Sequence, residues 1–201
     1  MSNINNNLKA DLNPPKYKIL ALFGKSGAGK DTIQRWLIEK FPNWNGIVSC
    51  TTRPKREYER DGIDYHFLEP DEFAEKVLNG SMLEAISFND WFYGTAIDEL
   101  KENTINVGVF NIEGVSCLLE DSRLEVLPVY IQCYDRERLY RNLKREKNPN
   151  CLEICRRFLT DEKDFSNIPF DFIPYANVYN KEVRFDGIIN IPEIKDFIYN
   201  N

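Results

Sequence analysis

The chain has 201 residues, of which 42% are hydrophobic and 29% are charged, and this composition is typical of a globular domain with one core and room for inserted lobes. The formal net charge of −6 excludes a general nucleic-acid or membrane surface, so residues that bind phosphate must be clustered locally. No apolar run reaches transmembrane length, the N-terminus lacks a signal-peptide pattern, and five irregularly spaced cysteines predict reduced thiols in the cytoplasm.

The first predicted elements surround a glycine-rich turn. Residues 1–15 are polar and rich in Asn, which predicts a flexible leader. An apolar run over 17–23 predicts a buried strand, and the apolar spacing over 32–40 predicts a helix. Strand, glycine-rich turn, lysine and helix form the context of a phosphate-binding P-loop, in which backbone N–H groups, the helix N-terminus and the lysine attract phosphate. The residues of this loop are Gly24, Lys25, Ser26, Gly27, Ala28, Gly29, Lys30, Asp31 and Thr32.

One residue of the loop departs from the usual pattern. The position after the lysine is normally Ser or Thr, whose hydroxyl binds Mg²⁺, and here it is Asp31. Its carboxylate could bind Mg²⁺ directly or through water, or it could cap the N-terminus of the helix. The sequence leaves both interpretations open.

The middle of the chain interrupts the alternation of strands and helices with polar sequence. Basic residues are concentrated in 51–67, against the acidic average of the chain. The residues around 50–95 are therefore predicted to form a lobe inserted over the site. We expect strands over 46–50, 65–68, 82–88 and 91–93, a helix over 71–78, and a second helix from a Thr95 cap to about Glu102.

The rest of the chain returns to alternating elements. The expected strands are 104–110, 124–133 and 175–180, and the expected helices are 113–120, 135–147, 152–163 and 191–199. This alternation predicts an α/β fold, with a parallel sheet covered by helices on both faces. A P-loop at the carboxyl end of the first strand places the site at that edge of the sheet, where a basic segment over 145–157 would form a small flap.

Two further motifs carry a resemblance to a known family. The first runs Ser49-Cys50-Thr51-Thr52-Arg53-Pro54-Lys55-Arg56 and continues over 61–67, and the second is Met82-Leu83-Glu84 followed by 91–95. In this order after a P-loop, they resemble guanylate kinase over residues 17–199. The resemblance implies a P-loop NTPase three-layer fold in one domain, 16–201. Its core would be 16–48, 97–140 and 165–201, its nucleoside-monophosphate (NMP) lobe about 49–96, and its lid about 141–158.

The resemblance also implies a reaction, the transfer of the γ-phosphoryl group of ATP, with Mg²⁺, to GMP or dGMP. The loop residues 24–32 and Asn180 would bind ATP. The implied GMP-binding residues are Ser49, Arg53, Arg56, Tyr65, Glu84, Tyr93, Thr95 and Asn111. The implied catalytic residues are Lys30, Arg53, Arg145 and Arg157, with Arg141 as the alternative to Arg145. The partners would be small nucleotides, without nucleic acid or membrane, and the protein a monomer or a homodimer.

The chemistry of these side chains suits the implied roles. Arginine forks are the best donors to a phosphate dianion, and lid arginines would neutralise charge on the transferring group. The carboxylate of Glu84 can accept from the N1–H and the 2-amino group of guanine together, a donor pair that adenine lacks. By contrast, Arg136 and Arg138 on a charged helix are interpreted as solvated surface residues, and His66 as a structural residue.

Three positions differ from the family pattern. The family's strand ends in two aspartates where this chain has Val109 and Asn111, and Glu113 replaces a glutamine. Asn111 can still accept from the guanine 2-amino group, but without a charge. We hypothesise that Asp31 supplies the carboxylate that the Mg²⁺ site has lost at Val109.

Other functions fit parts of the pattern. The Lys30-Asp31 pair also resembles ribose 1,5-bisphosphate phosphokinase and phage-type deoxynucleotide kinases, and the neutral Asn111 could relax base choice toward a broader deoxynucleoside monophosphate kinase. The sugar-phosphate kinase lacks the base-reading glutamate that is present here as Glu84. Non-catalytic scaffolds related to guanylate kinase usually have degraded P-loops, whereas this loop is intact.

Overall fold

The computed structural model describes residues 15–88, 90–145, 147–168, 175–177 and 189–199. Nearly all of the predicted leader lies outside this part of the chain, and so does Asn180, the predicted ATP-binding residue after the last strand.

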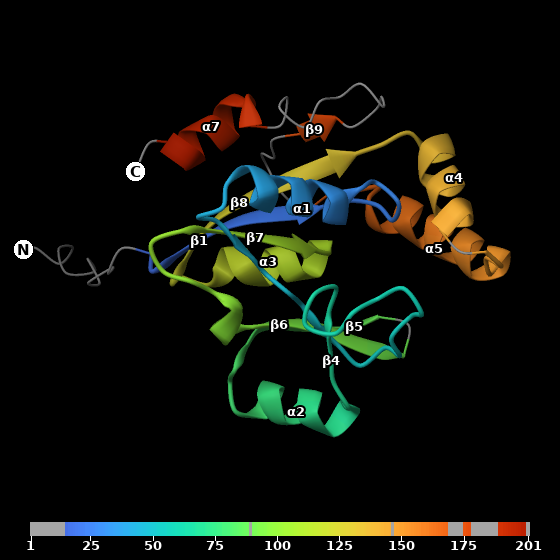
Figure 1. The fold of residues 1–201 in the computed structure, drawn as a ribbon, viewed down its shortest axis with the longest axis horizontal. Helices are drawn as coiled ribbons and strands as arrows, with labels where there is room; N and C mark the ends of the chain where they lie inside the picture. Colours follow the sequence, from blue (N-terminus) through green and yellow to red (C-terminus); the bar gives the residue numbers. More distant parts are fainter. Residues whose placement is uncertain (1–14, 89, 146, 169–174, 178–188, 200–201) are drawn as a thin grey trace, which may run out of the picture.

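A five-stranded parallel sheet forms the centre of the molecule, in the order β2–β7–β1–β8–β9 (Figure 1). The central strand β1 pairs in parallel with β7 on one side and with β8 on the other. Because it is covered on both faces, its sequence is an almost unbroken apolar run. The strands are β1 (Tyr17–Phe23), β2 (Asn45–Gly46), β7 (Ile105–Phe110), β8 (Leu124–Gln132) and β9 (Tyr175–Asn177).

Helices cover both faces of this sheet. Figure 1 shows α1 and α7 on one face and α3 on the other, with α4 and α5 beyond the carboxyl end of β8. Leu20 and Leu22 of β1 pack in the core with α1 and α7, whereas Ile19 and Phe23 pack in the core with α3. The predicted three-layer α/β fold is confirmed. The helices are α1 (Lys30–Lys40), α3 (Ile112–Glu120), α4 (Asp135–Arg145), α5 (Cys151–Asp164) and α7 (Pro192–Tyr199).

A second, four-stranded sheet lies apart from the first, in the order β4–β3–β6–β5, with α2 packed against it (Figure 1). It is built entirely from the polar middle of the chain, in which the sequence predicts an inserted lobe. Its elements are β3 (Cys50–Thr51), β4 (His66–Phe67), α2 (Pro70–Leu78), β5 (Met82–Phe88) and β6 (Trp91–Ala96).

Two predicted elements in this region are wrong. Thr95 does not cap a helix, because it pairs with Glu84 across the β5–β6 ladder, and only a single 3₁₀ turn, η1 (Ile97–Glu99), follows the strand. The predicted strand 46–50 is two short strands that belong to different sheets: β2 pairs with β7, and β3 pairs with β4 and β6. In both cases the secondary structure depends on pairing with strands that are distant in the chain, and this pairing cannot be predicted from the local sequence.

The chain passes between the two sheets through 47–49 and again through η1, and Glu99 joins these two passages. Its Oε2 accepts from the backbone N–H of Val48 at 3.1 Å, and its Oε1 lies 2.9 Å from Nε2 of His66. Its carbonyl oxygen accepts from Nδ2 of Asn45 at 2.7 Å. These contacts agree with the structural role expected for His66.

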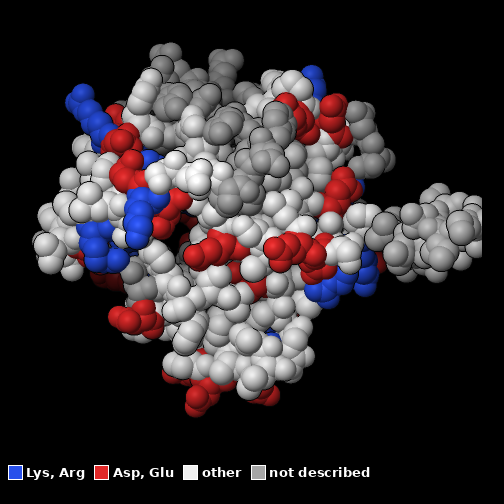
Figure 2. All heavy atoms as spheres, turned by 180° about the vertical axis from the view of Figure 1, so that it is seen from behind, with Lys and Arg blue, Asp and Glu red and all other residues white. Residues whose placement is uncertain are grey.

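Charge is unevenly distributed over the surface. Figure 2 shows acidic side chains across the middle of one face, with basic side chains in one group toward the side on which α4 and α5 lie and in another toward the opposite side. All five cysteines are free. Within the described residues, no helix combines the length and the apolar character needed to cross a membrane.

Candidate active site

The P-loop joins β1 to α1 at the carboxyl edge of the parallel sheet, as the sequence predicts. Gly24 and Gly27 have φ values of 150° and 78°. A Cβ at Gly24 would lie 2.5 Å from the carbonyl oxygen of Ile131 in β8, and one at Gly27 would lie 2.8 Å from that of Arg138 in α4. The loop therefore needs glycine at both positions, because its backbone lies directly against β8 and α4.

Lys30 begins α1 and reaches back across the loop. Its Nζ donates to the carbonyl oxygens of Gly24, at 2.7 Å, and Lys25, at 3.2 Å. Burial lowers the pKa of Lys30, and the negative charges of Asp31 and Asp161 oppose this shift. The lysine is thereby held along the loop, where its charge can face a nucleotide phosphate.

Two arginines of α4, Arg141 and Arg145, lie near the loop and differ in their contacts. Nη1 of Arg141 donates to the carbonyl oxygens of Gly27 and Ala28, at 3.2 Å each, so this side chain supports the loop backbone. Arg145 is exposed at the end of α4 and lies within electrostatic range of Lys30. Arg141 is thus engaged with the loop backbone, whereas Arg145 is exposed near the loop lysine.

In the connection between β3 and β4, the two predicted phosphate-binding arginines share a buried carboxylate, that of Glu59. The guanidinium of Arg53 donates to Glu59 through two bonds of 2.8 and 3.0 Å, and the backbone N–H of Arg56 donates to the same carboxylate at 2.8 Å. The arginine charges keep the pKa of Glu59 below its usual value, although its burial acts in the opposite direction. Sequence reasoning missed Glu59. Its only signal in the sequence is its spacing, six residues after Arg53 and three residues after Arg56.

The predicted tyrosines stand next to Arg53. Its guanidinium lies 5.6 Å from the ring centre of Tyr65, and the rings of Tyr65 and Tyr93 are 6.2 Å apart. Burial raises the pKa of Tyr65 to about 12, so its hydroxyl remains a hydrogen-bond donor at neutral pH. Ser49 comes directly before β3, and its carbonyl oxygen accepts from the backbone N–H of His66 at 2.9 Å.

Glu84, Thr95 and Asn111 meet at one point between the two sheets. Oγ1 of Thr95 donates to Oε1 of Glu84 at 2.8 Å, and both side chains are buried. Asn111 is the N-cap of α3, and its Oδ1 accepts from the backbone N–H of Gly114 at 2.7 Å. A Cβ at Gly114 would lie 3.0 Å from Oδ1 of Asn111 and 3.4 Å from Oε2 of Glu84, so this glycine leaves room for both side chains.

Burial also makes Glu84 an unusual acid. It raises the pKa of Glu84 to about 7, and the hydrogen bond from Thr95 acts against this shift. A carboxylate with this pKa is much more easily protonated than an exposed glutamate, and it lies 2.8 Å from the hydroxyl of Thr95.

Arg157 of α5 lies near residues of both the P-loop and the second lobe. It is within electrostatic range of Lys30, and also of Arg56 and Tyr93. Burial and the like charge of Arg56 lower the pKa of Arg157. Arg145 is also within range of Arg157, so the two predicted lid arginines lie near each other and near Lys30.

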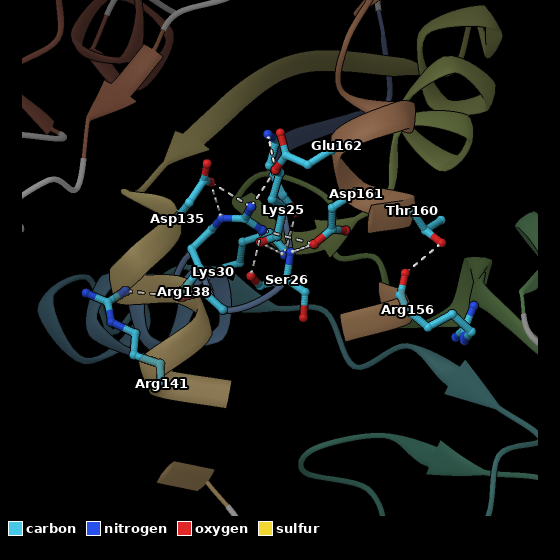
Figure 3. A network of polar contacts seen from close by, with 12 residues as sticks. Lys25, Ser26, Lys30, Asp135, Arg138, Arg141, Arg156, Thr160, Asp161 and Glu162 are labelled. Atoms are coloured by element: carbon cyan, nitrogen blue, oxygen red, sulfur yellow. Dashed lines mark hydrogen bonds and ion pairs between the residues drawn. The ribbon is translucent and has the colours of Figure 1, made fainter. Parts of the chain in front are cut away.

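The interpretation of Arg138 as a solvated residue is wrong. Its side chain is 1% exposed, and it donates to Asp135, Asp161 and Glu162 and to the carbonyl oxygen of Ser26 (Figure 3). Sequence reasoning missed this cluster because two of its carboxylates, Asp161 and Glu162, lie on a different helix, more than 20 residues farther along the chain. Arg136, two residues earlier on α4, is exposed as expected.

Asp31 lies in the first turn of α1, but the N-cap residue is Gly29, so Asp31 is not the capping residue. It is exposed, and its charge contributes to the raised pKa of Tyr65, so it lies on the side of the loop that faces the second sheet. In the described part of the chain, no group of three or more His, Cys, Asp or Glu side chains could hold a metal ion. A Mg²⁺ ion bound here would therefore take most of its ligands from phosphate and water, which suits a single protein carboxylate.

Comparison with known proteins gives a consistent picture. A sequence model of the guanylate kinase family matches residues 16–184. The guanylate kinase of Chlorobium luteolum is 40% identical over 85 residues, and that of Paramagnetospirillum magneticum is 32% identical over 161 residues. The first alignment covers 42% of this chain and 43% of the relative, and the second covers 77% and 75%. For several of the curated relatives, including the Chlorobium luteolum protein, the alignment spans only about half of the relative's length.

A solved structure extends the comparison to the fold. The crystal structure of guanylate kinase from Anaplasma phagocytophilum matches with a TM-score of 0.66 at 22% identity, over 90% of this chain and 88% of that one. This match shows the shared fold, and the family model covers both the P-loop and the polar block with Arg53, Glu84 and Thr95. The chain therefore belongs to the guanylate kinase family.

Proposed function

We propose that this protein transfers the γ-phosphoryl group of ATP directly to GMP, dGMP or both. The observation that carries the proposal is the buried pair of Glu84 and Thr95 beside Asn111, in a structure in which Arg157 lies within electrostatic range of both Lys30 and Arg56. A buried carboxylate that could bind a base, together with a P-loop lysine and an arginine near that lysine, suits a reaction between two nucleotides. In this proposal, about 49–96 form the NMP lobe, about 141–158 form the lid, and the protein works in the cytoplasm, which its five free cysteines support.

The acceptor would be held at its two ends. Glu84 would accept from the N1–H and the 2-amino group of guanine, and a base without this donor pair would leave a buried carboxylate unpaired. Arg53 and Arg56 would hold the phosphate, with the hydroxyls of Tyr65 and Tyr93 as further donors. Because Glu59 already holds the guanidinium of Arg53 through two hydrogen bonds, little side-chain entropy of this arginine remains to be lost when the phosphate binds.

The donor would be held by the P-loop, and the reaction would proceed by positioning and electrostatics. Lys30 would contact the phosphates of ATP, and Arg145 and Arg157 would neutralise the charge on the oxygens of the transferring group. The attacking group is already a phosphate anion, so no side chain has to remove a proton, and no covalent enzyme intermediate is needed. His66 is engaged with Glu99, which agrees with this account.

The residues at the loop fit a Mg²⁺ ion that is bound mainly through the nucleotide. Asp31 would hold it directly or through water, in place of the hydroxyl at the usual loop position and of the carboxylate replaced by Val109. When bound, the ion would neutralise charge on the β- and γ-phosphates.

Replacing Asp31 tests this assignment. Asp31→Ser restores the usual hydroxyl but leaves no carboxylate, because Val109 does not supply one. We expect the Mg²⁺ concentration for half-maximal activity to rise about 10-fold, since residues that support a metal site typically change its affinity by this order. A Mg²⁺ titration of ADP release measures the change, with Asp71→Ser at the exposed start of α2 as the matched control. An unchanged Mg²⁺ dependence and rate would contradict the role of Asp31.

The proposed activity is tested by coupled ADP release with ATP and Mg²⁺, with GMP, dGMP, AMP, CMP, UMP and dTMP as acceptors at matched concentrations. We expect turnover with GMP and dGMP alone. No turnover with any of these acceptors would contradict the proposal and would favour the sugar-phosphate kinase or the non-catalytic scaffold.

One observation favours a broader deoxynucleoside monophosphate kinase as the second candidate. Oδ1 of Asn111 accepts from Gly114, and Nδ2 donates to Glu113 at 3.2 Å, so this amide is committed to the start of α3. A neutral and already engaged group contributes less to base selection than a carboxylate would. Turnover of several bases in the acceptor series would support this candidate.

A further inference from the structure

Arg138 has the largest fully buried side chain in the described residues. Its five N–H groups point at Asp135, Asp161, Glu162 and the carbonyl oxygen of Ser26, at distances of 2.7 to 3.2 Å (Figure 3). The ring of Phe158 lies against it, with its centre 4.6 Å from the guanidinium carbon. A buried ion cluster of this kind is weak evidence for stability, because apolar residues of similar volume often stabilise a core as well or better. Its geometry therefore calls for another explanation.

The partners of Arg138 join three segments of the chain. Asp135 is on its own helix, α4, whereas Asp161 and Glu162 are on α5. The same two α5 carboxylates also contact the P-loop: Oδ2 of Asp161 accepts from the backbone N–H of Ser26 at 2.8 Å, and Oε1 of Glu162 accepts from Nζ of Lys25 at 2.7 Å. Arg138 thus lies where α4, α5 and the P-loop meet, and it contacts all three.

This junction fixes the helix that carries Arg157. Asp161 follows Arg157 by four residues, so the two side chains project from the same face of α5, one turn apart. Holding Asp161 against Ser26 therefore sets both the rotation of α5 and its distance from the loop. Arg157 then comes within electrostatic range of Lys30 and of Arg56.

We propose that Arg138 is a positioning residue for phosphoryl transfer: it clamps Asp161 and Glu162 of α5 to the P-loop, and so places Arg157 between the two nucleotides. This inference rests on the proposed function, but the clamp itself can be measured without turnover. Arg138 does not act on the substrate, and its effect passes through the place that it gives to Arg157.

The test replaces Arg138 by glutamine and uses Arg136→Gln, an exposed position on the same helix, as the matched control. We expect Arg138→Gln to lower kcat by about 10- to 100-fold, the loss typical of a small misplacement of a reacting group. The KM for GMP should stay within about twofold, because the clamp lies on the P-loop side and does not include the predicted acceptor residues Arg53 and Glu84. Arg138→Lys keeps one charge but not the fork, and should recover only part of kcat.

Hydrogen exchange gives the readout that is independent of turnover. Amides of 151–164 should exchange faster in Arg138→Gln than in the parent protein without nucleotide, and Arg136→Gln should leave them unchanged. An unchanged kcat with a lowered Tm, or a lowered kcat with unchanged exchange in α5, would overturn the proposal. If the parent protein has no turnover, the proposed function fails, while faster exchange in α5 would still support the clamp and unchanged exchange would overturn it.

A second variant covers the case in which Arg138→Gln does not fold. Glu162→Gln changes a side chain that is 39% exposed and leaves the buried guanidinium in place. It should lower kcat less than Arg138→Gln does, with the KM for GMP unchanged and with faster exchange in α5. A kcat and an exchange pattern equal to those of the parent protein would overturn the clamp.

Discussion

Arg157→Gln is expected to lower kcat by about 10³-fold or more, the size of effect that a transition-state arginine has in phosphoryl transfer. The arginine lies within electrostatic range of both Lys30 and Arg56, and in the proposed reaction the transferring group would pass near all three side chains. Because its contact would form only in the transition state, kcat and kcat/KM should fall together while the KM for GMP changes little. Steady-state ADP release with GMP measures both constants.

The neighbouring arginine provides the matched control. Arg156 is exposed and forms an ion pair with Glu153 on the outer side of α5, with bonds of 2.7 and 2.8 Å. Arg156→Gln removes the same charge from the same helix and should leave kcat within twofold. If the two variants lose activity to the same extent, general charge near the site explains the effect, and Arg157 has no special role.

Glu84→Gln is expected to lower kcat/KM for GMP by about 10⁴-fold, the order of the effect seen when a site built for hydrogen bonds loses one partner. The amide can accept one hydrogen bond from guanine, but its NH₂ group then faces a second donor. The same amide offers a donor and an acceptor, so discrimination against AMP should fall as well. The acceptor series that tests the proposed function measures both changes, and Glu75→Gln on the exposed side of α2 is the control.

The pH profile gives an independent readout of Glu84. Because burial holds its pKa near 7, kcat/KM for GMP should rise between pH 6 and 8 as the carboxylate forms, and Glu84→Gln should remove this rise. The same group makes the folded state less stable as the pH rises from 4.5 to about 7, since the unfolded chain loses this proton first. A rise in kcat/KM that persists in Glu84→Gln would assign the profile to another group.

The sequence predicts the elements whose signal is local. A run of apolar residues, a glycine-rich turn and a lysine are sufficient to place β1, the P-loop and α1, because backbone sterics and phosphate chemistry both demand those residues. Parallel strands alternating with helices likewise predict the layered fold. The resemblance to guanylate kinase predicts residues that the structure brings together, such as Arg53 with Tyr65 and Glu84 with Thr95.

The remaining features depend on partners that are distant in sequence. Thr95 has the side chain of a helix cap, but its pairing with β5 keeps it in a strand. Arg138 has the sequence surroundings of a solvated residue, and only the packing of α5 against α4 buries it. Glu59 is similar, since nothing in its local pattern distinguishes it from the other acidic residues around it.

The two passages between the sheets have a mechanical consequence. A body attached to another at two neighbouring points can rotate about the line through those points, whereas twisting or sliding would strain both attachments at once. Here Glu99 of the second passage binds the backbone of Val48 in the first and the side chain of His66, so the two passages are joined to each other. A rotation of the second sheet about these joined passages would carry Arg53 and Glu84 toward or away from the P-loop.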